Sequence, residues 1–313
     1  MKNIKVKYRK ASNKDISDIL KLFKEIFKRK ISKDYYNWKY LYNNKYYVFI
    51  ALIENKIIGH VAYNINLLQF KNNKILFASR HSSMVVKKYR NKNIYKNLIN
   101  QSINFLRKEN IQSLLIWPNE NNLFPSMKIL DYFPIFSSSL LELKINGIKK
   151  YIKNNKNFIN LNKNENKLIF DQYISNHNHL SLLKDKNYLI KRYLLIPNND
   201  FLLHEIKSKG KKSMIIFKIK NNNVYIMDIL SKPLLQDIHI KKFINLFNNY
   251  KCSIFILSNI YLPLYKILIL NSFIPSNYKF NCGFAEIKKN KITKDIIKNL
   301  SFFDYALGDT DVF

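Results

Sequence analysis

The stretch that decides the fold is Val85-Val86-Lys87-Lys88-Tyr89-Arg90-Asn91-Lys92-Asn93-Ile94-Tyr95. An apolar strand ends at Val86, a basic loop follows, and Ile94 begins a helix whose apolar residues recur at helical spacing. Free N–H groups at a helix N-terminus, together with the positive end of the helix dipole, can hold a phosphate or a diphosphate. Asn91 and Asn93 stand where such a loop usually needs glycine, and asparagine is the next most tolerant residue of left-handed angles. The stretch therefore predicts either an anion site or an ordinary solvated connection.

The residues on either side of this stretch predict a sheet with helices packed on it. Ser12 to Asp15 is typical of a capping box, and apolar spacing marks the other elements. In chain order we expect a strand at 4–8, a helix at 16–27, a helix at 34–42, strands at 47–53, 57–68 and 75–86, a helix at 94–106 and a strand at 113–117. Strand, loop, helix, strand requires a crossover between parallel neighbours. The first half is thus predicted to be an antiparallel meander followed by a parallel crossover.

Charge points to anionic partners without naming one. The chain of 313 residues holds 54 Lys and Arg against 21 Asp and Glu, so its formal net charge is 54 − 21 = +33. Such a surplus attracts nucleic acid, anionic lipid or phosphorylated small molecules. The many Lys, Asn and Ile residues with only five Gly are also what an AT-rich genome produces. A hydrophobic fraction of 47% is enough for one or two globular cores.

The cysteines and apolar segments predict a cytoplasmic protein. Cys252 and Cys282 are too few for a secreted disulfide framework. Lysines interrupt the first seven residues before the apolar core of a signal peptide could form. The most apolar stretch, 254–270, contains Pro263 and Lys266, so we expect no membrane span. His177 and His179 have no cysteine or carboxylate cluster around them, so no metal site is expected.

The second half repeats the first weakly but in order. Residues 35–41 align with residues 188–194 in their aromatic, basic and leucine positions, and residues 125–130 align with residues 263–268. Two matches in the same order, each beside the same kind of element, favour a duplicated fold. We expect a first domain at 1–146, a polar linker at 147–166 that is rich in Lys and Asn, and a degenerate second domain at 167–313.

Residues 90–95 resemble the Arg/Gln-x-x-Gly-x-Gly/Ala phosphate loop of the GNAT acyl-CoA N-acyltransferases, with asparagine in place of both glycines. Residues 89–94 are similar to a longer form of that loop, Tyr-Arg-Gly-Lys-Gly-Ile, and Trp117-Pro118-Asn119 is similar to the aromatic-Pro-Asn found at a strand end in the same branches. The element order agrees over about residues 4–145. The resemblance implies the α/β (α+β) fold class, with tandem GNAT-like folds that are each a mixed, mostly antiparallel central sheet flanked by helices.

This resemblance also implies acetyl-CoA, or another acyl-CoA, as co-substrate and no metal. Val85 and Val86 would lie on a splayed strand whose backbone holds the pantetheine arm and polarises the thioester carbonyl. Backbone N–H groups of Arg90, Asn91, Lys92, Asn93, Ile94 and Tyr95 would hold the diphosphate, and Arg90 and Lys92 would add charge. An acceptor amine that attacks the thioester must first lose its proton, so a general base is required.

Candidates for the remaining roles are scattered along the chain. His81 lies on the strand that leads to the loop, and an ordinary imidazole pKa near 6.5 suits a base. Asn119 and Tyr132 are the other catalytic candidates, Tyr132 as a substitute for the tyrosine that the family places after the Asn. Trp38 either packs in the core or borders the acceptor groove. Asp309 and Asp311 belong to an ending similar to the Gly-Asp-x-Asp of two-copy relatives in surface-sugar pathways. They either fold back against a cationic cleft of the chain, meet an acceptor amine, or belong to a frayed terminus.

The sequence thus predicts an N-acyltransferase that moves an acyl group, most simply acetyl, to an amine. The resemblance to the two-copy branch suggests an amino sugar, or a nucleotide-linked amino sugar, as the small-molecule acceptor. Two alternatives stay open. A Fem-type transferase would take an aminoacyl group from charged tRNA, which the net charge of +33 favours. A decayed, non-catalytic copy would only bind an acidic partner. The oligomeric state is not predicted.

Overall fold

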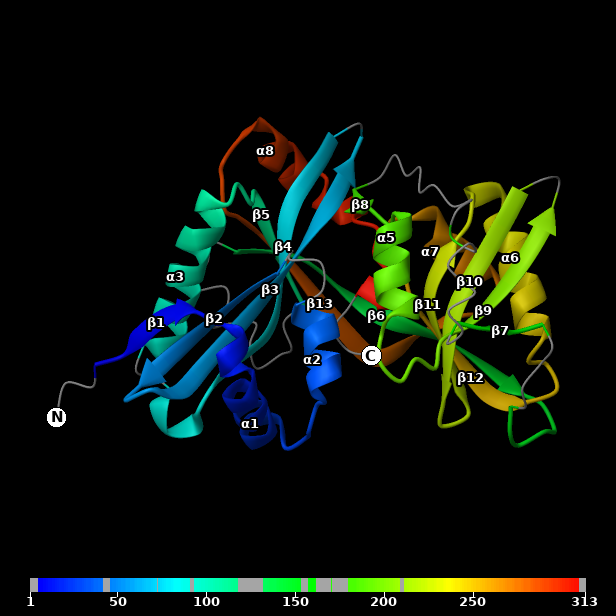
Figure 1. Cartoon of the computed structure of the whole chain (residues 1–313). Coiled ribbons are helices and arrows are strands. Elements are labelled where there is room, and N and C mark those ends of the chain that lie inside the picture. Colours follow the sequence, from blue (N-terminus) through cyan, green and yellow to red (C-terminus); the bar gives the residue numbers. More distant parts are fainter. Residues whose placement is uncertain are drawn as a thin grey trace. The chain divides into compact units, whose positions relative to one another are not determined.

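The computed structural model (Figure 1) describes the residue ranges 5–41, 46–71, 73–90, 93–117, 132–152, 157–161, 170, 180–208 and 211–309. The chain divides into two compact units. The first comprises residues 1–68, 74–135 and 282–298, and the second comprises residues 69–73, 136–281 and 299–313. No helix among the described residues is long and apolar enough to cross a bilayer.

The first unit contains the predicted meander and crossover. Its elements are β1 (Lys7–Lys10), α1 (Ile16–Phe27), α2 (Lys33–Tyr40), β2 (Tyr46–Ile53), β3 (Lys56–Phe70), β4 (Asn73–Val85), α3 (Ile94–Lys108), β5 (Ser113–Ile116) and α8 (Lys291–Lys298), with the end of β13 (Ile274–Glu286). The strands follow one another in the order β1-β2-β3-β4-β5-β13. In Figure 1, α3 lies on one side of these strands and α1 and α2 lie on the other.

Local chemistry explains why these elements begin and end where they do. The Ser12 backbone N–H donates to the Asp15 carboxylate over 2.7 Å, which completes the predicted capping box before α1. Lys28 ends α1 in the left-handed conformation. Between β2 and β3, Glu54 and Asn55 have φ of 47° and 65°, the two left-handed residues that a tight hairpin turn requires.

From α2 onward, the order of elements in the first unit recurs in the second unit, beginning at α5 (Lys186–Leu189). The second unit contains α5 running into a π-helix (Ile190–Leu194), then β9 (Leu202–Ser208), β10 (Lys211–Lys220), β11 (Asn223–Leu230), α6 (Pro233–Asn245), β12 (Lys251–Leu257), α7 (Pro263–Leu270) and the start of β13. β9, β10 and β11 form an antiparallel meander, and β12 pairs parallel to β11. Both units therefore contain a helix, an antiparallel meander, a second helix and a parallel strand in that order, which favours duplication.

The final strand of each half pairs with the parallel strand of the other half. β6 (Tyr132–Asn146) follows β5 in the chain but pairs with β12, through Leu140–Leu257 at one end and Asn146–Lys251 at the other. β13 follows β12 but pairs with β5, from Gly283–Ile116 to Glu286–Ser113. The two compact units each combine segments from both halves, because each half supplies the last strand of its counterpart's unit. The domain bounds at 146 and 167 stay predictions. Residues 159–160 of the expected linker form β7, which pairs with β9.

A buried imidazole pair ties α6 to the meander of the second unit. His239 of α6 is fully buried, and its Nε2 lies 3.0 Å from Nδ1 of His204 on β9. Its Nδ1 lies 2.5 Å from the Ser213 hydroxyl on β10. Burial, with His204 and Lys242 nearby, lowers the pKa of His239 to about 3. Both ring nitrogens of His239 thus have a hydrogen-bond partner while the imidazole is neutral.

This pair makes the second unit sensitive to acid. Because the folded pKa of His239 lies below the unfolded value near 6.5, the unfolded chain binds a proton first as pH falls. We expect His239 to remove about 2 kcal/mol from the free energy of unfolding between pH 7 and pH 5. Urea unfolding of His239→Gln, which retains hydrogen-bonding groups, should show a pH dependence weaker by that amount. Equal pH dependence in the two proteins would contradict this reading of the pair.

Candidate active site

The decisive stretch forms a corner between β4 and α3. Val86, just after β4, donates its N–H to the Ile58 carbonyl on β3 over 2.9 Å, which fixes the start of the corner. Asn93, at the N-cap of α3, has φ of 55° and ψ of 7°, the left-handed conformation that glycine usually supplies. The first backbone bond of the helix runs from the Asn97 N–H to the Asn93 carbonyl. The N–H groups of residues 94–96 therefore have no acceptor inside the helix.

Cations gather at this corner. Lys87 and Lys88 are exposed in the short 3-10 helix at Lys87–Tyr89, and with Lys56 they line a hollow beside Val86. The Arg90 guanidinium donates from Nε to the Val85 carbonyl over 3.1 Å, so its charge lies at the end of β4. Asn91 and Lys92 lie outside the described residues. Free N–H donors, the helix dipole and these cations suit a diphosphate.

Among the described residues, the edge of β4 next to this corner continues past the end of its parallel neighbour β5. β4 and β5 pair from Phe77–Ser113 to Arg80–Ile116, and β5 ends at Ile116. Residues 81–85 continue β4 beyond that point. His81, the expected base, lies at the first of these positions and is half-buried. An extended edge of this kind can form strand-like hydrogen bonds with a ligand.

Sequence reasoning missed a polar cluster behind the same edge. The Tyr40 hydroxyl of α2 contacts the Ser82 hydroxyl, and Nδ1 of His60 on β3 lies 2.9 Å from the Ser82 carbonyl. Burial lowers the pKa of His60 to about 4, against a smaller opposing effect of this bond. The ring is therefore neutral near pH 7, and because a carbonyl only accepts, Nδ1 carries the proton. The equivalence of residues 35–41 with 188–194 was the one signal available, since it pairs Tyr40 with Tyr193.

The other predicted residues lie in different places. Trp38 is 7% exposed and its ring lies 5.3 Å from that of Tyr35, so it packs in the first unit. Tyr132 is the first residue of β6, and its side chain lies outside the description. Asn119 and Asp311 also lie outside the described residues. Their catalytic or binding roles stay predictions.

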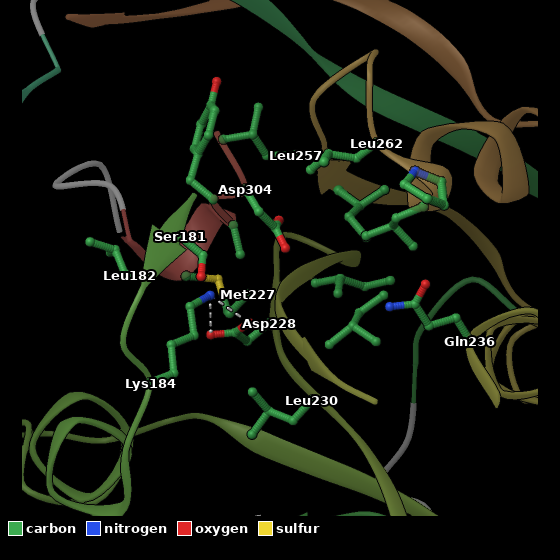
Figure 2. Close-up of a pocket in the computed structure, with 17 residues that line it drawn as sticks. Ser181, Leu182, Lys184, Met227, Asp228, Leu230, Gln236, Leu257, Leu262 and Asp304 are labelled. Carbon is green, nitrogen blue, oxygen red and sulfur yellow. Dashed lines mark hydrogen bonds and ion pairs between the residues drawn. The ribbon is translucent and has the colours of Figure 1, made fainter. Parts of the chain in front are cut away.

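Asp309, expected near an acceptor amine, is engaged by a lysine of the chain itself. Its side chain is fully buried in the second unit, and one carboxylate oxygen lies 2.9 Å from Lys184 Nζ. The Tyr188 hydroxyl donates to the other oxygen over 2.7 Å. Lys184 also lies 2.9 Å and 3.0 Å from the two oxygens of Asp228 (Figure 2). Asp228 accepts from the Tyr193 hydroxyl as well. The segment that carries Asp309 is thus pinned to β11.

The pKa shifts of this cluster follow from burial and mutual attraction. Burial, opposed by Lys184, raises the pKa of Asp228 to about 6. Burial alone would lower the pKa of Lys184, but Asp228 and Asp309 raise it well above its ordinary value. Figure 2 shows the pair at one side of a pocket lined by β11 and β12. Asp304 and Tyr305 of the C-terminal segment line the same pocket.

Comparison with known proteins places this geometry in a family of folds. The domain family described as "Acetyltransferase (GNAT) domain" matches residues 7–127. A probable N-acyltransferase from Enterococcus faecalis V583 superposes with a TM-score of 0.67 at 12% identity, over 88% of this chain and 72% of that one. A GCN5-related N-acetyltransferase from Anabaena variabilis ATCC 29413 gives 0.68 at 15% identity, over 91% and 73%. The chain has the GNAT fold.

Further similarities to this GNAT fold include an enzyme holding an acyl-CoA. Saccharomyces cerevisiae N-myristoyltransferase with bound myristoyl-CoA superposes with a TM-score of 0.59 at 11% identity, over 90% of this chain and 82% of that one. The matched domain and these neighbours share the GNAT fold with this chain. Within the described residues, no group of three or more His, Cys, Asp or Glu side chains could hold a metal ion.

A curated sequence relative adds no functional information. The MATH and LRR domain-containing protein PFE0570w of Plasmodium falciparum (isolate 3D7) is 36% identical over 102 residues, which are 32% of this chain. The chain spans only about 1% of the length of that protein. We therefore draw nothing about activity from this match.

The buried Lys184 cluster predicts a large cost for removing its cation. Lys184→Met leaves the Asp228 and Asp309 carboxylates buried without a counter-charge, so we expect the free energy of unfolding to fall by about 3–5 kcal/mol. Lys241→Met is the matched control, because Lys241 pairs with Asp237 over 2.7 Å on the exposed face of α6. It should cost less than about 1 kcal/mol. Urea unfolding measures both, and equal losses would show that Lys184 is not essential to the cluster.

Proposed function

We propose that the first unit binds an acyl-CoA and transfers its acyl group, most simply acetyl, to an amine. The observation that carries this proposal is the left-handed Asn93, which starts α3 beside the free edge of β4. It lets the N–H groups of residues 94–96 face a diphosphate although the usual glycines are absent. The match of residues 7–127 to a GNAT acetyltransferase domain supports the same assignment.

The residues divide the chemistry between binding and proton transfer. Backbone groups of residues 81–85 would pair with the pantetheine arm and donate to the thioester carbonyl oxygen as it gains charge. The acceptor nitrogen attacks the carbonyl carbon, the C–S bond breaks, and the sulfur leaves as a thiolate that takes up a proton. His81 would accept the proton that the amine loses, directly or through water.

The acceptor is proposed to be an amino sugar or its nucleotide-linked form. Support comes from the Gly308-Asp309-Thr310-Asp311 ending and its similarity to two-copy relatives. The net charge of +33 favours a nucleic-acid partner instead, as in tRNA-dependent aminoacyl transfer. Salt-sensitive binding of tRNA without any binding of CoA would favour that alternative.

The second unit lacks the corresponding anion site. Pro233 is the first residue of α6 and has no N–H, and the Leu235 N–H already donates to the Lys232 carbonyl over 2.9 Å. Its N-cap, Lys232, has φ of −68° and is not left-handed. The C-terminal segment, residues 299–309, also lies against β11 and β12 at the pocket of this unit. We therefore propose one acyl-CoA site per chain.

The Asn93 conformation can be tested with a pair of substitutions. A β-branched residue resists positive φ by about 1–2 kcal/mol, so Asn93→Val should weaken acetyl-CoA binding about tenfold. Asn93→Gly accepts the same φ and should bind within about twofold of the wild type. Isothermal titration calorimetry measures both affinities. Retention of full affinity by Asn93→Val would remove the corner from the proposed site.

The stoichiometry tests the difference between the units. Calorimetric titration with acetyl-CoA should give one site per chain, and the thermal unfolding temperature should rise with ligand concentration. Two equivalent sites would contradict the proposed loss of the second site, and no binding would contradict the proposed function.

A further inference from the structure

Ser82 has an unusual backbone conformation for its position. Its φ is 46°, and among the described non-glycine residues with left-handed φ it is the only one inside a strand. A serine in this region costs conformational energy that a glycine would avoid. Such a kink persists only where surrounding groups hold it, and bulged strands are common beside active sites.

Two side chains from different elements hold Ser82. Tyr40 of α2 contacts its hydroxyl, and His60 of β3 donates from Nδ1 to its carbonyl over 2.9 Å. Tyr40 is 1% exposed and His60 is fully buried, and their ring centroids are 6.1 Å apart. Both are therefore fixed by the core, so the kink is held from a rigid base.

The kink lies where β4 becomes a free edge. Pairing with β5 ends at Arg80, so Ser82 is in the segment 81–85 that borders the proposed thioester position. A left-handed residue turns the strand that follows it, so Ser82 sets the direction of the N–H and carbonyl groups of residues 83–85.

The corresponding strand of the second unit, β11, has no left-handed residue like Ser82. Tyr193, equivalent to Tyr40 in the weak repeat, also donates its hydroxyl to the last strand of its meander, at Asp228. β11 carries an irregularity there, since Ile216 pairs with Asp228 while Phe217 pairs with Ile226. However, no residue of β11 has a left-handed φ. Of these two strands, only β4 of the first unit, which leads to the corner before α3, contains a left-handed residue.

We propose that Tyr40 and His60 are positioning residues for acyl transfer, which hold Ser82 so that the free edge of β4 meets the thioester carbonyl. This inference rests on the proposed acyl-CoA site and adds residues that touch neither the diphosphate nor the acceptor. It predicts that loss of the Tyr40 hydroxyl weakens binding of acetyl-CoA more than binding of CoA, because both ligands have the amides of the pantetheine arm but only acetyl-CoA has the thioester carbonyl.

The test compares Tyr40→Phe with Tyr193→Phe in the full chain. Calorimetry should show that Tyr40→Phe binds acetyl-CoA about three- to tenfold more weakly, the effect of one hydrogen bond, while CoA binding changes by less than about twofold. Tyr193→Phe should leave both affinities unchanged, although it removes the equivalent hydroxyl. Equal weakening of both ligands, or none, by Tyr40→Phe would overturn the proposal.

A second measurement needs no ligand. Amide hydrogen exchange of peptides covering residues 80–90 should be about threefold faster in Tyr40→Phe than in the wild type, and unchanged in Tyr193→Phe. Unchanged exchange in Tyr40→Phe would overturn the positioning role. If the wild type bound neither CoA nor acetyl-CoA, the acyl-CoA proposal would fail, whereas the exchange result would still show whether Tyr40 holds the strand.

Discussion

The parallel pairing of β4 with β5 is short, and the candidate site depends on where it stops. The two strands share a register only from Phe77–Ser113 to Arg80–Ile116. Beyond Arg80, β4 continues to Val85 with a left-handed residue at Ser82. A short 3-10 helix at Lys87–Tyr89 then precedes the N-terminus of α3. A strand edge and a helix N-terminus are both sets of unused backbone donors. We propose that their meeting at one corner binds a ligand with an extended arm and an anionic end.

The two units share this arrangement but differ in what completes it. β11 and β12 also pair briefly, from Val224–Ile254 to Ile226–Ile256. In the first unit a left-handed asparagine leaves the helix donors free, whereas in the second unit a proline removes one donor and a turn uses another. The C-terminal segment then lies against the second unit, fixed by Asp309 on Lys184. We propose that binding and structural roles have separated between the two units.

Much of the first unit was predictable because its signals are local. The capping box at Ser12, the turn at Glu54 and the helix at Ile94 each follow from neighbouring residues. The exchange of β6 and β13 was not predicted, because strand pairing across the chain leaves no local pattern. The contacts of Lys184 with Asp228, 44 residues away, and of Tyr40 with Ser82, 42 residues away, were missed for the same reason. For Asp309 the sequence left open a contact with a cationic cleft of the chain or with an acceptor amine, and the structure pairs it with Lys184.

The most direct measurement of the central claim is a crystal structure of the full chain with CoA. The account predicts the diphosphate within hydrogen-bond distance of the backbone N–H groups of residues 94–96, with the pantetheine arm along residues 81–85 of β4. A diphosphate bound only by surface lysines, or a ligand bound in the second unit while this corner stays empty, would contradict it.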